Sequence, residues 1–532
     1  MNGLLGTGPL VRLAIRRDRV LLPSWIAVFV LVAASSAAAT LGLFPTVESR
    51  VQAAAANNST TALVALYGRV YDPTSLGSVG MVKLGGLGAV LVAVLAMILV
   101  ARHTRAEEES GRLELVGATV VGRYAPLAAA LIVTAGANLL LGLLTAGGLI
   151  RGGLPAAGSL AFGLAWAGVG IAFAAIAAVT AQLAGTARGA TSAAAAVLGA
   201  VYLLRAIGDT AGAGGPRWLS WLSPIGWGQQ FRPYAGNRWW VLMVTLAFAA
   251  TLTAAAFALA ARRDLGASLL PDRPGRAAAA PGLRSPLALS WRLNRGALLG
   301  WALAFLLAGV VFGSIASSVG DLLDSPQARD FITRLGGEKG LTDAYLAAEL
   351  AIVGVLAAAF GVQAAMRLRT EETGLRAEPL LATAVTRTRW LASHLVMALA
   401  GTAVLMTAAG AGAGLTHALQ SGHPGEFGRV LGAALVQLPA AWLVTAVVVA
   451  AFGLVPRATA VGWVALVAFL LLGEFGPLLG LNQFLMDLSP FAHVPRLPGA
   501  PLTVLPLVLL LAVAAGLVLL GVAGFRRRDV GT

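Results

Sequence analysis

The chain of 532 residues contains no cysteine, which excludes disulfide bonds, thiolate metal sites and cysteine nucleophiles. Charge is also scarce, since only 11% of the residues are charged, against roughly 25% in soluble domains. A water-soluble fold of this length could not cover its surface with so few charges. Together with a mean hydropathy of +0.82, this scarcity predicts that most of the chain lies in an apolar solvent.

Phosphate-binding motifs are missing as well. Lysine occurs only at Lys83 and Lys339, and neither follows the glycine pattern of a G-x-x-x-x-G-K-[ST] loop. No polar stretch is long enough for a nucleotide-binding domain, and the histidines show no metal-ligand spacing. We therefore expect no catalytic residue, metal or cofactor in this chain. If the function of the chain depends on ATP hydrolysis, the ATPase must be a separate polypeptide.

The net charge of +15 could suggest a nucleic-acid partner. The arginines, however, fall in short clusters between long apolar runs. This distribution is typical of membrane proteins, in which basic residues mark the cytoplasmic loops. We therefore expect contact with membrane lipids and no nucleic acid.

Apolar runs of membrane-spanning length recur along the chain. A helix needs about 20 apolar residues to cross roughly 30 Å of hydrocarbon. Twelve runs meet this requirement, near 22–44, 84–101, 125–150, 158–184, 190–207, 240–261, 297–317, 346–366, 390–416, 430–452, 459–481 and 502–524. Basic residues concentrate in the loops on the side of the N-terminus, which predicts that both termini are cytoplasmic. The sequence thus predicts an all-α, multi-pass protein of the plasma membrane with about twelve transmembrane helices.

An internal repeat divides the chain. Residues 105–123 and 369–387 are identical at nine of nineteen positions at a constant offset of 264. Two further matches keep the same order: Arg16, Arg19 and Trp25 with Arg292, Arg295 and Trp301, and Leu222-Ser223-Pro224 with Leu488-Ser489-Pro490. We therefore expect two six-helix halves, 1–265 and 291–532, joined by a cytoplasmic linker at 266–290. Six spans return the chain to the cytoplasm, so the halves are parallel and related by a pseudo-twofold axis.

The repeated charged loop follows the second span of each half. Glu108 and Arg112 are spaced i,i+4, as are Glu372 and Arg376, and this order favours a short helix. Such a helix would present its charges to the cytoplasm: Glu107, Glu108, Arg112 and Glu114 in the first half, and Glu371, Glu372, Arg376 and Glu378 in the second. A plain solvated loop helix is the alternative. Duplication of the charged positions favours docking to a twofold-symmetric cytoplasmic partner.

The other repeated segments flank the membrane. The basic residues Arg16, Arg19, Arg292 and Arg295 predict interfacial helices, with Trp25 and Trp301 near the same interface. Two outer segments contain Ser223-Pro224 and Ser489-Pro490 and are too polar and too rich in proline to span. They could form short helices that dip into the outer leaflet and cap a pathway, or serve as an aromatic belt.

The plan of the chain resembles the ABC-2 type permeases. Two six-helix halves, basic amphipathic segments, an E-E-x-x-x-R-x-E loop after each second span and a Ser-Pro segment before each sixth carry this resemblance. In detail the chain is similar to the fused, double-length actinobacterial branch that exports polyketide antibiotics (the tetronasin-resistance type). The resemblance implies that both charged loops carry coupling helices, each seated in a cleft of one of two cytoplasmic ABC ATPase subunits that bind ATP and Mg²⁺. The second half departs from the first by having Leu375 for Gly111 and Pro379 for Leu115.

These observations predict the permease subunit of an ATP-driven exporter of hydrophobic or amphipathic small molecules, and not an enzyme. The main alternative is a 6+6 secondary transporter driven by an ion gradient. Against it, no chain of acids and histidines crosses the predicted spans, and no G-x-x-x-D-R-x-G-R-R loop is present. A lipid-modifying enzyme is a further alternative, but a single active site has no need for two acidic loops.

Overall fold

The computed structural model describes residues 3–211, 214–264, 266–269, 277–280, 282–318, 337–475 and 482–529. Within these ranges every regular element is a helix, and eleven helices are long and apolar enough to cross a membrane. The predicted all-α polytopic class is therefore confirmed. The span expected near 459–481 lies only partly within the described residues. It contains α21 (Val461–Phe475), which is shorter than the other eleven.

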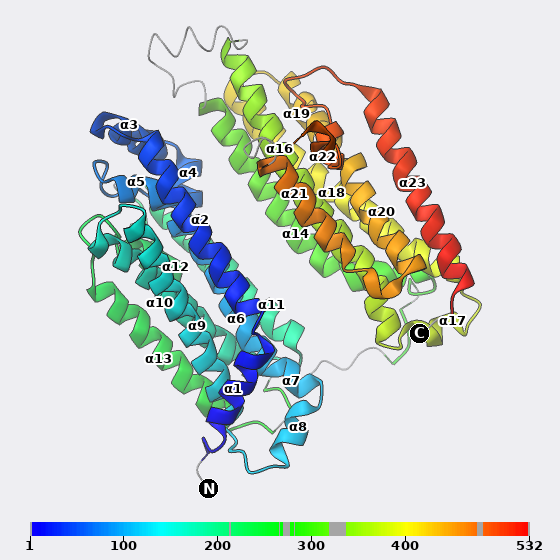
Figure 1. Cartoon of the computed structure of the whole chain (residues 1–532), viewed down its shortest axis with the longest axis horizontal. Coiled ribbons are helices and arrows are strands. Elements are labelled where there is room, and N and C mark those ends of the chain that lie inside the picture. The colour runs from blue at the N-terminus through cyan, green and yellow to red at the C-terminus, as the bar shows by residue number, and fades with distance from the viewer. Residues whose placement is uncertain are drawn as a thin grey trace. The chain divides into compact units, whose positions relative to one another are not determined.

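The chain divides into two compact units, Met1–Gly275 and Arg276–Thr532. In the first unit the helices, in chain order, are α1 (Thr7–Arg17), α2 (Leu21–Leu43), α3 (Val47–Ser59), α4 (Thr61–Tyr67), α5 (Leu76–Lys83), α6 (Ala89–His103), α7 (Arg105–Glu109), α8 (Arg112–Gly117), α9 (Ala125–Arg151), α10 (Ala156–Leu183), α11 (Ala187–Thr210), α12 (Pro224–Gln230) and α13 (Trp240–Ala260). One end of this unit carries α7 and α8, and the opposite end carries α3, α4, α5 and α12 (Figure 1).

Helix α10 forms the centre of the first unit. It packs against α6, α9, α11 and α13, and 78% of its most apolar 18-residue stretch is buried within the unit. Its sequence is mostly alanine and glycine with a few aromatic residues, and Trp166 and Phe173 belong to the main core cluster. Small residues let helix backbones approach closely, which drives helix association where the surrounding lipid is itself apolar.

The closest approach between α9 and α10 is a glycine pair. A Cβ atom added at Gly142 would clash with the carbonyl oxygen of Gly163, and one added at Gly163 would clash with the carbonyl of Gly142. Both obstacles are backbone atoms, which cannot move aside without shifting a helix. The two glycines therefore determine the distance between these helices.

Replacing Gly142 by leucine is expected to destabilise the first unit by about 1–3 kcal/mol, because α9 and α10 must separate to admit the side chain. The matched control is Gly147→Leu on the same helix, where no described atom lies within 4 Å of the added Cβ. Thermal melting of both variants in detergent, followed by gel filtration, measures the difference. Equal melting temperatures would show that the glycine crossing is not close-packed.

The second span of the first unit starts earlier than the sequence indicates. Helix α5, a π-helical turn at Leu84–Gly88 and α6 follow one another without a break. The residues before α5 contain the short helices α3 and α4. The glycine-rich stretch Gly85–Gly88 does not interrupt the helix, because its backbone continues as a π-turn.

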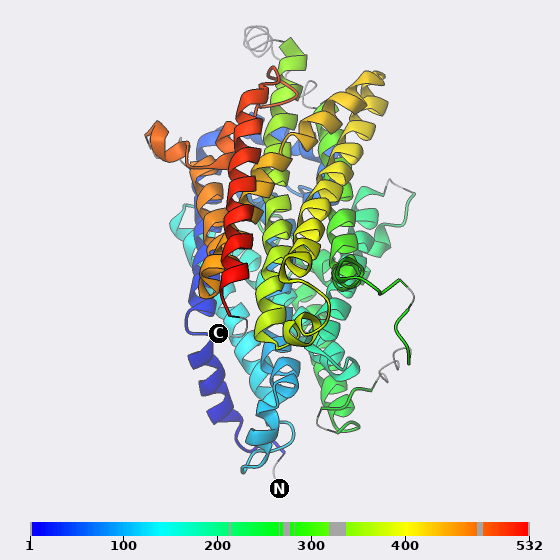
Figure 2. The same ribbon diagram turned by 90° about the vertical axis from the view of Figure 1, so that its right-hand side faces the viewer.

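The second unit repeats the helical plan of the first. Its helices are α14 (Pro286–Ser318), α16 (Gly337–Thr373), α17 (Ala377–Leu381), α18 (Arg387–Ser421), α19 (Gly425–Leu435), α20 (Leu438–Leu454), α21, α22 (Gln483–Met486) and α23 (Val504–Arg527). Helix α18 packs against α14 and α16, and α20 packs against α16 and α23, as side-by-side rods (Figure 2). Gly453 of α20 lies against Gly521 of α23, a second glycine crossing.

The two units differ where each first span begins. In the first unit, α1 is a separate amphipathic helix, and residues 18–20 divide it from α2. In the second unit the corresponding residues belong to one continuous helix, α14, which includes Arg292, Arg295 and Trp301. The separate interfacial helix predicted for both halves is therefore present only in the first. A basic run alone does not distinguish an interfacial helix from the extension of a span.

Candidate functional site

The charged loop of the first unit is a broken helix. Helix α7 ends at Glu109 and α8 begins at Arg112, with Gly111 between them in the left-handed conformation at a φ of 70°. Arg112 consequently does not pair with Glu108. Its Nη1 donates to Oε1 of Glu107 at 3.4 Å, and Arg17 of α1 pairs with the same carboxylate.

The loop of the second unit follows the same path. Helix α16 ends at Thr373, Leu375 is left-handed with a φ of 55°, and α17 follows. The Nε of Arg376 donates to Oε2 of Glu371 at 2.8 Å. The predicted i,i+4 pairs are thus wrong in both halves, since the left-handed residue turns the chain and brings each arginine over the glutamate five residues before it.

Glu108 holds the first loop against the rest of its unit. Both carboxylate oxygens accept from Arg263, with Nη1 2.9 Å from Oε2 and Nη2 2.5 Å from Oε1. Arg105, whose side chain is buried, also pairs with Glu108 and donates from Nε to the carbonyl of Ala184 at 2.7 Å. The Nε of Arg263 donates to Oε1 of Gln182 at 2.7 Å. Glu108 therefore connects α7 to the ends of α10 and α13.

Glu372 makes the equivalent contact in the second unit. It accepts from Arg528 through two bonds, Nη1 to Oε1 at 2.6 Å and Nη2 to Oε2 at 2.9 Å. Arg369 lies 3.3 Å from Oε2, in the place that Arg105 takes in the first unit. The Arg528 guanidinium also stacks on Phe452 and Phe525, at 4.8 and 5.1 Å from their ring centres.

A third arginine completes each cluster. Arg123 donates to the carbonyls of Ala260 at 3.1 Å and Arg263 at 2.7 Å, and Arg387 donates to the carbonyl of Arg528 at 2.6 Å. A cation at these carbonyls complements the negative end of the last helix of each unit. We call each set a loop clamp: Arg105, Glu108, Arg123 and Arg263 in the first unit, and Arg369, Glu372, Arg387 and Arg528 in the second.

The glutamate of each loop clamp is buried, whereas the tip of each loop is exposed. The Glu108 and Glu372 side chains are only 8% and 1% exposed. On α8 the exposed residues include Arg112, Glu114 and Leu115, and on the second loop they include Arg376 and Glu378. The eight predicted coupling residues therefore divide into two groups. Glu108 and Glu372 of the clamps, together with the ion-paired Glu107 and Glu371, are buried or half-buried, whereas Arg112, Glu114, Arg376 and Glu378 form a surface that a partner could reach.

Leu375 stores strain in the second loop. A left-handed backbone costs a non-glycine residue about 1–2 kcal/mol, and Gly111 takes the same conformation without that cost. Leu375→Gly is therefore expected to stabilise the second unit by about 1 kcal/mol. The measurement is a thermal melt in detergent, with Gly111→Leu as the reciprocal variant that lowers stability. If the leucine is preferred at 375, the turn is not strained.

The four arginines predicted to be interfacial are exposed, and both predicted tryptophans contact a phenylalanine of their own helix. Arg16, Arg19, Arg292 and Arg295 are exposed. Trp25 stacks on Phe29 at 5.8 Å, and Trp301 lies 5.9 Å from the Phe305 ring. Residue 18 adds an unpredicted contact, since buried Asp18 accepts from His103 at 2.5 Å and lies 3.0 Å from Nε of Arg102.

The Ser-Pro segments form short helices at the other end of each unit. Ser223 is the N-cap of α12, its Oγ accepting from the Gly226 N–H at 3.2 Å, and Pro224 is the first helical residue. Ser489 precedes a short 3₁₀-helix, Pro490–His493, but its Oγ has no partner within the described part of the chain. Both segments form the short helices expected of them. Among the described residues, no group of three acidic or histidine side chains could hold a metal ion.

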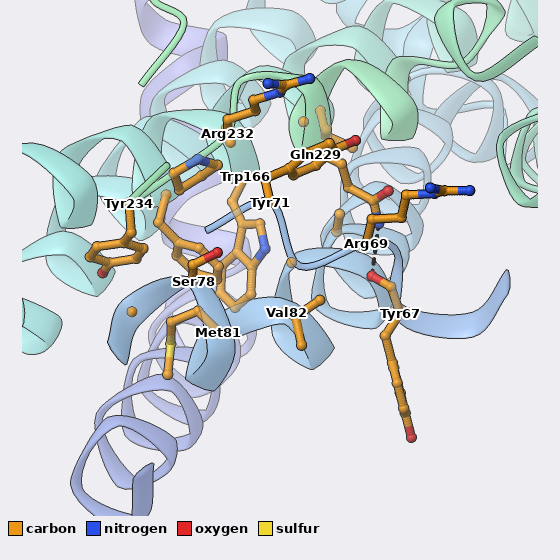
Figure 3. Close-up of a pocket in the computed structure, with 18 residues that line it drawn as sticks. Tyr67, Arg69, Tyr71, Ser78, Met81, Val82, Trp166, Gln229, Arg232 and Tyr234 are labelled. Carbon is orange, nitrogen blue, oxygen red and sulfur yellow. Dashed lines mark hydrogen bonds between the residues drawn. The ribbon is translucent and has the colours of Figure 1, made fainter. Parts of the chain in front are cut away.

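A pocket lies at the same end of the first unit as α12. It is a partly open pocket of about 540 Å³, a volume that includes open solvent, where α5, the π-turn and α10 meet α12 and the residues that follow it. Its lining includes five aromatic residues and two arginines, most of them labelled in Figure 3: Tyr67, Tyr71, Phe162, Trp166, Tyr234, Arg69 and Arg232. We call it the aromatic pocket.

Arg263 and Arg528 are the site residues that the sequence analysis missed. Each follows the last span of its unit, in the triplets Arg262-Arg263-Asp264 and Arg527-Arg528-Asp529. This repeated Arg-Arg-Asp triplet, a fourth motif shared by the two halves, was a usable signal. No sequence signal identified the partner of either arginine, because Glu108 is 155 residues before Arg263 and Glu372 is 156 residues before Arg528.

Comparison with known proteins places both units in one family. The sequence profile described as "Multidrug efflux system permease Rv1217c, C-terminal domain" matches residues 8–259 and 283–526. The chain is also 50% identical, over 532 residues, to the multidrug efflux system permease protein Rv1217c of Mycobacterium tuberculosis. That alignment covers 99% of this chain and 96% of the relative. Because both matches include the two charged loops and the last helix of each unit, the chain belongs to the Rv1217c family of multidrug efflux system permeases.

Proposed function

We propose that the chain is the permease of an ABC-2 type exporter that moves hydrophobic or amphipathic small molecules out of the cytoplasm. Its cargo includes antibiotics, drugs or lipid-like compounds, with polyketides among the candidates. Two copies of a separate ABC ATPase, which bind ATP and Mg²⁺, drive the transport. The name of the Mycobacterium tuberculosis relative, a multidrug efflux permease, supports the direction and the breadth of cargo.

The observation that carries this proposal is the pair of loop clamps. In each unit the tip of the charged loop is exposed, and a buried glutamate that pairs with arginines anchors the loop below it. A loop that only linked two spans would not need this anchoring. A loop that receives force from a partner does, because the anchor transmits the displacement to the ends of several helices.

The clamp defines which helices move with the loop. In the first unit, Glu108 and Arg105 join α7 to Arg263 after α13 and to the carbonyl of Ala184 at the end of α10. An ATPase that closes on ATP and displaces α8 would move these helix ends together. In this scheme both loops and both termini lie in the cytoplasm, and the aromatic pocket lies on the opposite side.

Copurification tests the proposed ATPase partner. The tagged chain, isolated from its native membrane, is expected to bring down an ABC ATPase whose hydrolysis is stimulated by amphipathic drugs. Reversing the exposed charges with Glu114→Lys and Glu378→Lys should reduce the recovered ATPase by about tenfold, which corresponds to 1.4 kcal/mol. The variant should melt at the wild-type temperature, since neither carboxylate is buried.

The matched control is Arg12→Glu, an exposed charge reversal on α1. It should leave ATPase recovery unchanged. The proposal fails if no ATPase copurifies and if efflux from cells collapses with an uncoupler while ATP stays high. That result would instead identify a secondary transporter driven by an ion gradient.

A further inference from the structure

The walls of the aromatic pocket are held in place by specific contacts. The Tyr234 ring lies directly against Gly77 and Gly158, where any Cβ atom would clash with it. Its hydroxyl is 2.9 Å from the Ser159 hydroxyl. The indole N–H of Trp166 donates to the carbonyl of Leu84 at 3.2 Å, at the start of the π-turn. These contacts fix the Tyr234 and Trp166 side chains in the lining, as expected of a largely preformed ligand pocket.

The backbone around this cavity departs from ordinary conformations. Arg232 and Tyr234 both have positive φ, 54° and 62°, although neither is glycine. The π-turn at Leu84–Gly88 contributes Gly85 to the lining. Strained residues and π-turns both concentrate at binding sites, because folding alone seldom selects them.

The pocket contains positive charge that no acid in its lining neutralises. Its described lining includes Arg69 and Arg232 but no aspartate or glutamate. Arg69 donates to backbone carbonyls, from Nε to Asp209 at 2.6 Å. The Asp209 carboxylate is already engaged, accepting from Ser220 at 2.7 Å and lying 3.6 Å from Arg205.

Arg232 is the less satisfied of the two cations. Its guanidinium lies over the Tyr71 ring at 4.3 Å (Figure 3), and its buried Nε has no hydrogen-bond partner among the described residues. Burial, together with the nearby Arg238, lowers the pKa of Arg232. Oε1 of Gln229, also in the lining, is buried and unpartnered within the described part of the chain. A ligand with an anionic oxygen would satisfy Arg232, and a hydroxyl or protonated group would satisfy Gln229.

From this geometry we infer that the aromatic pocket binds an amphipathic organic anion, its apolar body between Trp166 and Tyr234 and its acidic group at Arg232. The inference deepens the proposed function and rests on it for the assignment of this pocket to the release side of the pathway. Two sources share this chemistry: an exported cargo that carries a carboxylate, and an anionic lipid of the surrounding membrane.

A fluorescent fatty acid tests the site without any partner. The probe is dansyl-labelled undecanoic acid, titrated into the full chain in phosphatidylcholine nanodiscs, with empty nanodiscs as background. Its methyl ester is the neutral comparison. The wild-type chain should bind the acid saturably and at least about tenfold more tightly than the ester, because a buried charge-assisted contact is lost in the ester.

Two variants locate the binding. Arg232→Gln should reduce affinity for the acid to that for the ester and leave the ester unaffected. Arg151→Gln, at an exposed arginine that ends α9 outside the lining, should change neither. Gly85→Leu should abolish saturable binding of both compounds. A Cβ at Gly85 meets only Phe162, at 3.9 Å, so the leucine fills the cavity without a backbone clash.

The outcomes separate the site, its ligand and the transport function. Unchanged binding in Gly85→Leu would overturn the site, and equal affinity of the wild-type chain for acid and ester would overturn the anionic ligand. If phosphatidylglycerol in the nanodisc displaces the probe, the anion is a lipid; if it does not, the anion is cargo. If the wild-type chain copurifies with an ATPase but does not bind the probe, this inference alone is refuted. If the wild-type chain binds the probe but no ATPase copurifies, only the proposed function is refuted.

Discussion

Glu108→Lys is expected to destabilise the first unit by about 3–5 kcal/mol, the usual cost of breaking a buried ion pair. The carboxylate is almost fully buried and accepts from both Arg105 and Arg263. A lysine there would place three cations together in a site with little access to water. Thermal melting in detergent measures the loss, and efflux should fall with it because the loop is no longer anchored.

The second unit provides an internal comparison for the clamp. Arg528 contacts Glu372 as Arg263 contacts Glu108, but Arg528 also stacks on Phe452 and Phe525. Each of these cation–π contacts is worth about 0.5–2 kcal/mol. Arg528→Glu should therefore destabilise its unit more than Arg263→Glu destabilises the first.

Two further variants show whether the effect comes from the ion pair. The double variant Glu108→Lys with Arg263→Glu restores opposite charges and should recover part of the lost stability. Glu114→Lys, on the exposed face of the same loop, should melt at the wild-type temperature. A wild-type melting temperature for Glu108→Lys would mean that the clamp does not hold the loop.

Arg205→Met is expected to cost the first unit a similar 3–5 kcal/mol. Arg205 lies within α11 and is fully buried. It pairs with Asp209 at 3.6 Å, donates to the carbonyl of Ala65, and lies 4.5 Å from the Tyr202 ring. The substitution would leave a buried carboxylate without its cation and the end of α4 without its cap. Thermal melting in detergent measures this loss as well.

A second substitution tests whether the loss of stability comes from the unpaired Asp209 carboxylate. Arg205→Met with Asp209→Asn removes both charges and should be more stable than Arg205→Met alone, because no uncompensated charge remains. Arg188→Met, an exposed arginine at the other end of α11, is the matched control and should be neutral. If the double variant is the less stable of the two, Asp209 has a role apart from its pairing with Arg205.

The pairing of charges shows where sequence reasoning failed. Spacing predicted Glu108 with Arg112, but a single left-handed residue, Gly111, redirects Arg112 to Glu107. The same residue position in the second half is a leucine, which no propensity rule would place in that conformation. The structure shows it there because Arg376 pairs with Glu371 and fixes the turn.

The aromatic pocket was out of reach for a similar reason. Tyr71, Trp166 and Arg232 come from three separate stretches of the chain, and only the packing of α10 against its neighbours brings them together. The sequence did predict short helices or an aromatic belt in the Ser-Pro segment, and α12 forms there. The sequence contained no information on which side chains would share a cavity.

By itself, the sequence determined the all-α membrane class, the approximate positions of the eleven spanning helices found in the described residues, the internal repeat and the identity of the charged loops. These properties follow from local composition, because the length of an apolar run and the recurrence of a motif are independent of folding. Only the tertiary structure decided that Glu108 and Glu372 are buried anchors rather than exposed contacts. Their partners lie more than 150 residues away in sequence, and the burial of a charge depends on what packs over it.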